Sequence, residues 1–302
     1  MTTIPSQPVL GFIGTGVMGA SMAGHLLAAG HVLHVHSRTR AKAEDLISQG
    51  AVWAEDPAAL AAICDVVFTM VGFPTDVEQL YDGPAGLIAQ ARPGTVLVDM
   101  TTSRPDLAQR LAADGAGRGI AVVDAPVSGG DKGAREAALS IMVGGSQAAF
   151  AALLPLLQLM GRTIVHQGPA GSGQHCKMCN QMVVAANMIG VCESLAYARR
   201  AGLDPATVLQ SISSGAAGSW ALSNLAPRIL AEDFAPGFYV KHFIKDMAIA
   251  AASADDLGLD TPGLDLALEL YRQVAAAGDD HRGTQALFRL YGGTPTTAAG
   301  SS

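Results

Sequence analysis

The first thirty residues constrain the fold more than any other segment of this chain. A short apolar run at Val9 to Ile13 leads into Gly14-Thr-Gly-Val-Met-Gly19, and an amphipathic stretch follows to Ala29. This order is typical of a buried strand, a tight turn and a helix. Glycines allow a pyrophosphate to approach the helix N-terminus, where backbone N–H groups favour an anion. We therefore interpret the turn as dinucleotide-binding rather than merely structural, through Gly14, Thr15, Gly16, Val17, Met18 and Gly19.

Strand and helix patterns then alternate along the first half of the chain. The strands are expected at residues 32–36, 66–71, 95–99, 120–124, 140–143 and 163–166, and the helices at 40–49, 105–118 and 146–160. Alternation of this kind predicts an α/β fold with a mostly parallel, doubly wound sheet.

The alternation stops near the glycine-rich segment at 168–173, and helical patterns follow, beginning with one long helix from Gly173 to about Arg200. We expect a dinucleotide-binding domain at residues 1–168 and an all-helical domain at 169–291, joined by this long helix. The Gly/Thr/Ala/Ser-rich segment 292–302 is predicted to be a disordered tail.

Composition excludes several classes of function. Hydrophobic residues make up 49% of the 302 positions and charged residues 15%, and the net charge is −7. A chain of this kind can bury a large core, and its acidic balance argues against nucleic acid as the main partner. The residues before Val9 lack an apolar signal region, and no long apolar run is free of polar interruption, so we predict a cytoplasmic protein without membrane contact.

Residues at the end of the second predicted strand bear on cofactor choice. NAD-binding proteins usually place an acid there for the ribose 2′-hydroxyl, whereas this chain has Ser37, Arg38, Thr39 and Arg40. A guanidinium beside hydroxyls suits a 2′-phosphate, so the sequence favours NADP, with NAD possible. The alternative is that the arginines form a solvated helix start.

Three later strands also end in residues suited to a ligand, because ligands of such sheets bind at the carboxyl edge. Val71 ends one strand, and Asp99-Met-Thr-Thr-Ser-Arg-Pro105 follows the next, with Thr102 as a candidate contact of the nicotinamide end. Asp124-Ala-Pro-Val-Ser-Gly-Gly130 follows a third, and its turn at Ser128, Gly129 and Gly130 can hold a carboxylate. Helix capping and a plain glycine loop are the alternatives.

Lys177 lies one turn inside the long helix, in Gly171-Ser-Gly-Gln-His-Cys-Lys177. A lysine entering an apolar segment needs water, a partner or loss of its proton, because an isolated buried ammonium is costly. If the helix start lies near the cofactor, Lys177 can protonate the oxygen formed when hydride reaches a carbonyl. Asn180 and Gln181 follow one turn later on the same face, as candidate contacts of the substrate. A solvated surface lysine is the alternative.

The helical half contains two further candidate features, a charge pair and a CxxC motif. Lys245-Asp246 interrupts an apolar helix pattern, so Lys245 is a candidate contact of the nicotinamide or the substrate, with Asp246 supporting it or Lys177. An ordinary surface ion pair is the alternative. Cys176 and Cys179 form a CxxC, but no second Cys/His pair stands at metal-ligand spacing, so we predict no metal site.

In their order along residues 9–290, these motifs resemble the β-hydroxyacid dehydrogenase family. They are the glycine turn, Asp99 to Pro105, Asp124 to Gly130, Gly171 to Gln181, and Lys245-Asp246. The resemblance implies a Rossmann domain followed by a helical domain that commonly forms a homodimer or homotetramer. It also implies Lys177 as catalytic acid/base, a substrate carboxylate at Ser128, Gly129 and Gly130, and cofactor contacts from Thr102 and Lys245. The family often has Asn four residues after the lysine, where this chain has Gln181, so either Asn180 or Gln181 is expected to touch substrate.

The leading hypothesis is an NAD(P)-dependent oxidoreductase that interconverts a short β-hydroxy acid and its semialdehyde, like 3-hydroxyisobutyrate dehydrogenase. Alternatives are a tartronate semialdehyde reductase or a glyoxylate/succinic semialdehyde reductase, and, in another class, a noncatalytic dinucleotide-binding module. Imine reductases share the plan but generally lack the lysine. A 6-phosphogluconate dehydrogenase is disfavoured, because the helical domain is short and Thr101-Thr102 replaces a Gly-Gly-Asn-Ser stretch.

Overall fold

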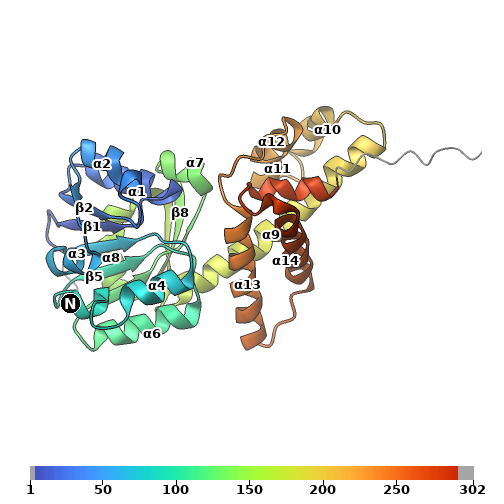
Figure 1. The fold of residues 1–302 in the computed structure, drawn as a ribbon. Coiled ribbons are helices and arrows are strands. Elements are labelled where there is room, and N and C mark those ends of the chain that lie inside the picture. Colours follow the sequence, from blue (N-terminus) through green and yellow to red (C-terminus); the bar gives the residue numbers. More distant parts are fainter. Residues whose placement is uncertain (1–3, 292–302) are drawn as a thin grey trace, which may run out of the picture. The chain divides into compact units, whose positions relative to one another are not determined.

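A computed structural model describes residues 4–291 of the chain, so the predicted tail at 292–302 lies outside the described residues. The chain divides into two compact units at the bond between Asn180 and Gln181, inside one long helix (Figure 1). The change from strands to helices comes earlier, because the last strand ends at Gly168 and the long helix begins at Ser172.

The first unit is built on one sheet, which contains nine strands in the described part of the chain. Their order is β3-β2-β1-β4-β5-β6-β8-β7, with β9 paired to β8. The strands are β1 (Leu10–Ile13), β2 (Leu33–His36), β3 (Val52–Trp53), β4 (Val66–Thr69), β5 (Val96–Asp99), β6 (Ala121–Asp124), β7 (Val127–Ser128), β8 (Leu139–Gly144) and β9 (Gly161–Gly168). The mostly parallel α/β sheet predicted from the sequence is confirmed; β8 departs from it by running antiparallel to β6 and β7.

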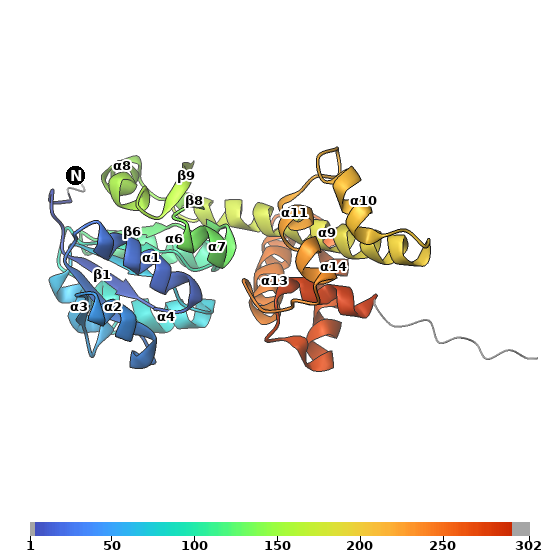
Figure 2. The same ribbon diagram turned by 90° about the horizontal axis from the view of Figure 1, so that it is seen from above.

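The central strands are continuous apolar runs because both faces of the sheet are covered. Alternate residues of β4 enter different cores: Val66 and Phe68 join one hydrophobic cluster and Val67 joins the other. Helices line both faces (Figures 1 and 2). They are α1 (Val17–Ala28), η1 (Arg40–Ala43), α2 (Glu44–Ser48), α3 (Pro57–Ile63), α4 (Pro74–Tyr81), α5 (Leu87–Gln90), α6 (Pro105–Ala116), α7 (Gly130–Arg135) and α8 (Gln147–Leu157).

Register places the carboxyl ends of the strands side by side. In β5 and β6 the pairing runs from Val96 opposite Ala121 to Asp99 opposite Asp124. Chain order reverses direction at β1 and β4, which pair directly, and the crevice at such a switch point is where ligands of doubly wound sheets bind.

The second unit is helical, and its helices gather around the C-terminal part of α9 (Figure 2). The side chain of Asp204 accepts hydrogen bonds from the N–H groups of Ala206 and Thr207, so it caps the helix that starts at Pro205. The helices are α9 (Ser172–Arg200, shared with the first unit), α10 (Pro205–Ile212), α11 (Trp220–Asn224), α12 (Ala226–Leu230), α13 (Val240–Asp256), α14 (Pro262–Val274), η2 (Ala275–Asp279) and η3 (Thr284–Leu290). None of the helices in residues 4–291 has the length and apolar character needed to cross a membrane.

Candidate functional site

The three glycines between β1 and α1 have different tasks. Gly14 has φ 98°, and a Cβ there would lie 2.2 Å from the carbonyl oxygen of Met70. A Cβ on Gly19 would lie 1.9 Å from the carbonyl oxygen of Gly14, so Gly19 lets helix and strand pack closely. At Gly16 nothing lies within 4 Å of an added Cβ. The open side of the turn is therefore at Gly16.

The start of α1 fits an anionic ligand. Gly16 is the N-cap, no side chain caps the helix, and the first turn carries no acidic residue. The Thr15 hydroxyl is buried and has no hydrogen-bond partner within the described residues. A buried polar group without a partner is costly, and uncapped N–H groups favour a phosphate. The residues present thus fit the pyrophosphate of a dinucleotide.

At the end of β2 the arginines have carboxylate neighbours. Arg38 is 83% exposed, and its guanidinium lies 3.2 Å from a carboxylate oxygen of Asp76 at the start of α4. The second oxygen of Asp76 accepts hydrogen bonds from the N–H groups of Gly72 and Phe73. Arg40 stacks over the ring of Trp53. Because an exposed ion pair is weak, Asp76 leaves Arg38 available to an incoming anion.

The ends of β4 and β5 are tied together by buried polar bonds. The N–H of Val71 donates to the Thr101 hydroxyl at 3.0 Å. Asp99 accepts from the Thr69 hydroxyl and from the N–H of Thr101 on the same oxygen, Oδ1. Burial raises the pKa of Asp99 to about 6, and the negative charge of Asp124 adds to this, while the bonds from Thr101 and Thr69 oppose it. Thr102 follows at once, partly buried.

The end of β6 anchors the start of α9. Asp124 accepts from the N–H of Gly171 through Oδ1 at 2.8 Å and from the N–H of Gln174 through Oδ2 at 2.9 Å. Burial raises the pKa of Asp124 above its ordinary value, and the hydrogen bonds from these N–H groups offset only part of that rise. The start of α9 also lies close to β8, because a Cβ on Gly173 would lie 2.4 Å from the carbonyl oxygen of Met142.

Lys177 and the predicted carboxylate turn come together in the first unit. The Lys177 ammonium donates to the carbonyl oxygen of Val127 at 2.9 Å, and the residue is only 6% exposed. Ser128 follows Val127 in β7, and Gly129 and Gly130 then take φ values of 129° and 63°. Lys177 is therefore buried in the first unit and is not the solvated surface lysine that the sequence left open.

Gln181 and Asp246 are both buried in the second unit. The side-chain amide of Gln181 donates to Oδ2 of Asp246 at 2.7 Å, and Lys245 forms an ion pair with Oδ1 at 2.9 Å. The Lys245–Asp246 pair is not on the surface, because the two side chains are only 12% and 2% exposed. Asn180, which precedes Gln181, is partly buried.

Gln174 was not singled out from the sequence. Its side chain is fully buried and bonds the backbone on both sides of Thr102. The available signal was a polar residue one helical turn before Lys177, hence on the same face of the helix. Its partners lie more than 70 residues away, so the sequence does not identify them.

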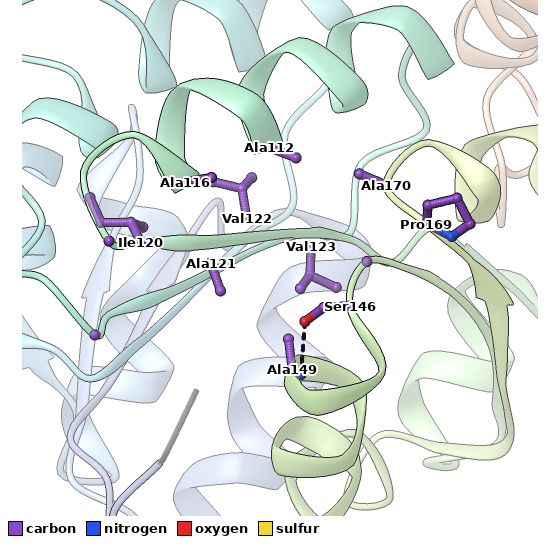
Figure 3. A pocket seen from close by; sticks show the side chains of 13 residues that line it. Ala112, Ala116, Ile120, Ala121, Val122, Val123, Ser146, Ala149, Pro169 and Ala170 are labelled. Carbon is purple, nitrogen blue, oxygen red and sulfur yellow. Dashed lines mark hydrogen bonds between the residues drawn. The ribbon is translucent and has the colours of Figure 1, made fainter. Parts of the chain in front are cut away.

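A hollow of about 630 Å³ elsewhere in the first unit holds none of the predicted site residues (Figure 3). It runs along β6 between Ala112 and Ala116 of α6 on one side and Ser146 and Ala149 of α8 on the other. Its lining carries no charged side chain.

Among the residues described, no three or more His, Cys, Asp or Glu side chains are grouped to hold a metal ion. Cys176 and Cys179 are free thiols, the first partly buried and the second exposed.

Comparison with known proteins agrees with these features. Residues 9–168 match the model of the NAD-binding domain of 6-phosphogluconate dehydrogenase, and residues 171–291 match that of the NAD-binding domain of NADP-dependent 3-hydroxyisobutyrate dehydrogenase. An uncharacterized oxidoreductase of Bacillus subtilis is 54% identical over 94% of this chain and 99% of its own. The 2-hydroxy-3-oxopropionate reductase of Escherichia coli is 40% identical over 89% of this chain and 92% of its own.

The fold is also found among solved structures. The 3-hydroxyisobutyrate dehydrogenase of Mycobacterium tuberculosis, solved with L-serine, is 30% identical, with a TM-score of 0.84 over 96% of this chain and 99% of that one. Motifs, fold and relatives lead to one conclusion: this chain belongs to the β-hydroxyacid dehydrogenase family of NAD(P)-dependent oxidoreductases.

Proposed function

We propose that this enzyme interconverts a short β-hydroxy acid and its semialdehyde, with Lys177 as general acid and base. The observation that carries the proposal is the bond from the Lys177 ammonium to the carbonyl of Val127, at the turn of Ser128, Gly129 and Gly130. It brings a proton donor and a turn suited to a carboxylate to one end of β7. A substrate in which a single carbon separates the carboxylate from the carbinol carbon matches this combination of proton donor and carboxylate turn.

The proton steps follow from the chemistry of the amine. In reduction, Lys177 gives a proton from Nζ to the oxygen that forms as the carbonyl is reduced; in oxidation, the neutral amine takes the hydroxyl proton. The bound nicotinamide dinucleotide supplies the hydride or accepts it. The bond to Val127 fixes the amine, so its direction is set before substrate arrives.

Substrate binding is assigned to the turn that follows Val127. The Ser128 hydroxyl and the N–H groups of Gly129 and Gly130 are proposed to hold the carboxylate. Asn180 and Gln181 on α9 are both proposed substrate contacts, and the Gln181 amide nitrogen also donates to Asp246. Lys245 keeps its proposed role as a cofactor contact, with Asp246 in support.

For the cofactor we propose a preference for NADP over NAD. Arg38 stands at the end of β2, where the ribose of a bound dinucleotide is expected, and no acid stands beside it in Ser37-Arg38-Thr39. The matching family model for residues 171–291 is that of an NADP-dependent enzyme. The glycine turn, Val71 and Thr102 complete the proposed cofactor contacts.

The Escherichia coli relative favours a second candidate, reduction of tartronate semialdehyde, also called 2-hydroxy-3-oxopropionate. Nicotinamide absorbance should be followed with both cofactors against 3-hydroxyisobutyrate, methylmalonate semialdehyde, tartronate semialdehyde, succinic semialdehyde and glyoxylate. The first two compounds should give the highest kcat/KM. A higher value with tartronate semialdehyde would decide for the second candidate.

A homodimer or homotetramer and a cytoplasmic location stay predictions. Light scattering tests the oligomeric state.

Replacing the amine tests the catalytic role. Lys177→Ala should lower turnover by at least about 10²-fold, because the acid is lost, while NADPH affinity changes little. Lys42→Ala, which removes an exposed lysine, should leave turnover unchanged. If Lys177→Ala turned over like wild type, Lys177 would not be the acid.

Replacing Arg38 tests cofactor preference. Arg38→Ala should weaken NADPH binding by roughly tenfold to a hundredfold, because one charged bond to phosphate is lost, and should affect NADH little. Binding is measured by fluorescence titration, with Arg162→Ala, an exposed arginine of β9, as the matched control. Equal losses for the two cofactors would remove the argument for a 2′-phosphate.

A further inference from the structure

Gln174 holds the backbone on both sides of Thr102. Its Oε1 accepts from the N–H of Ser103 at 2.9 Å, and its Nε2 donates to the carbonyl oxygen of Thr101 at 2.8 Å. The side chain is fully buried, and both partners are buried too. Bonds of this kind are expensive to break, because each partner is then stranded away from water.

The chemistry of this pair requires an amide. One partner is a donor and the other an acceptor, so the side chain must both accept and donate. An ionised carboxylate only accepts, and an aliphatic side chain does neither. Glutamine therefore fits this place, whereas an ionised glutamate or a leucine does not.

Gln174 also connects the loop after β5 to the helix that carries Lys177. Its own N–H donates to Asp124 at the end of β6, and Lys177, three residues on, lies on the same face of α9 and donates to Val127 in β7. The first two turns of α9 are thus bonded to the loop after β5, the end of β6 and the start of β7, all within the first unit.

We propose that Gln174 is a positioning residue for the reaction. It fixes the loop of Thr102 against the first turn of α9, and so sets the placement of the nicotinamide end relative to the Lys177 amine. The role rests on the proposed function, since it acts through Thr102 as a cofactor contact and Lys177 as the acid. Misplacement of reacting groups by about 1 Å can cost about 10²-fold in rate.

Three variants separate the possibilities. Gln174→Leu removes both bonds, and Gln174→Glu keeps the shape but loses the donor when ionised. Gln158→Glu makes the same change at an exposed glutamine on the same unit and should behave like wild type. Both Gln174 variants should lower kcat by roughly 10- to 100-fold at pH 8. Only Gln174→Glu should recover as pH falls toward 5, because a protonated carboxyl can donate again.

Hydrogen exchange supplies a readout that needs no reaction. In cofactor-free protein, the amides of residues 100–104 should exchange at least about tenfold faster in Gln174→Leu than in wild type, while β1 and α1 are unchanged. Equal exchange would overturn the proposal whether or not Lys177 is catalytic.

Isotope effects separate positioning from simple loss of folded enzyme. With C4-deuterated NADPH and the panel aldehyde that is reduced fastest, the deuterium effect on kcat should rise in Gln174→Leu, because misaligned hydride transfer becomes rate-limiting. Fewer active molecules would lower kcat with the same isotope effect. Faster exchange with wild-type kcat and isotope effect would overturn the positioning role, and Lys177→Ala in the same assay reports on the proposed function separately.

Discussion

Two aspartates end neighbouring strands in register, and they differ in how their oxygens are used. Asp99 of β5 receives the Thr69 hydroxyl and the Thr101 N–H on a single oxygen. Asp124 of β6 receives one N–H on each oxygen, from Gly171 and Gln174. Both are buried. Asp99 organises its own strand end, whereas Asp124 holds the first turn of the helix that carries Lys177.

The difference shows that residue type and strand position do not fix a role at this edge. The loop after each strand decides which donors reach the carboxylate. Asp99 accepts from the Thr69 hydroxyl of the adjacent β4 and from its own loop, through the N–H and the hydroxyl of Thr101. Asp124 meets the N-terminus of a helix from 47 and 50 residues away, and needs both oxygens. Substituting each aspartate by asparagine should therefore have opposite outcomes.

The largest effect is expected at Asp124. Asp124→Asn leaves one oxygen and puts an NH₂ group against the N–H of Gly171 or Gln174. One bond to a charged acceptor is lost and one donor is stranded, so we expect a loss of about 3–5 kcal/mol in the free energy of unfolding. Urea denaturation at pH 7 measures it, and turnover should fall because α9 loses its anchor.

Asp99→Asn is the control for that experiment. An asparagine oxygen placed at Oδ1 keeps the Thr69 hydroxyl and the Thr101 N–H. The Thr101 hydroxyl, which also bonds the carboxylate, can turn to accept from the new NH₂ group, so at pH 7 stability should stay within about 1 kcal/mol of wild type or rise. Comparable losses in the two variants would break the distinction between the two carboxylates.

The second effect is a pH dependence that belongs to Asp99. Burial raises its pKa from an ordinary 3.8 to about 6, so the folded protein holds this proton more tightly than the unfolded chain does. The stabilisation is complete below about pH 3.8 and is lost as pH rises through about 6. Wild type should thus lose up to about 3 kcal/mol relative to Asp99→Asn over this window.

Denaturation of both proteins at pH 4, 5, 6 and 7 tests this dependence. Because Asp124 adds to the raised pKa of Asp99, the substitution at Asp99 also removes a repulsive neighbour of Asp124. A stability difference that stays constant from pH 4 to pH 7 would contradict a titration of Asp99 in this range.

The smallest effect is expected at Tyr81, which is linked through Thr69 to Asp99. Its buried hydroxyl lies 3.0 Å from the Thr69 hydroxyl, which donates a hydrogen bond to Asp99. Tyr81→Phe should cost about 1 kcal/mol in the free energy of unfolding and leave kcat unchanged. A clear fall in kcat would mean that the Asp99 side also controls the placement of α9.

Much of the fold follows from local patterns in the sequence. The strand, glycine turn and helix at residues 10–28 follow from apolar runs and the backbone freedom of Gly14. The short strands β3 and β7 were missed, because two residues show no period and form only through partners elsewhere in the sheet. Helix α7 was not predicted, because only the turn at Ser128, Gly129 and Gly130 was expected there and a short segment with two glycines has weak helix propensity.

The candidate site, too, was predicted only in part from the sequence. The sequence pointed to the glycine turn, the turn at Ser128 and the lysine, because glycine patterns and a charge in an apolar helix are local signals. It did not assign Gln174, and it left Asn180 and Gln181 as equal candidates. The structure adds the bond from Gln181 to Asp246, which spans 65 residues, and the choice between the two amides stays a prediction.

Sequence alone therefore determined the class of fold, the order of its elements and the residue types available for chemistry, since backbone freedom, periodicity and charge act over a few residues. Only the tertiary structure decided which donor faces which acceptor: Val127 for Lys177, two helix N–H groups for Asp124, and the backbone beside Thr102 for Gln174. Buried polar groups must find partners, and which partners they reach depends on packing between segments far apart in the chain.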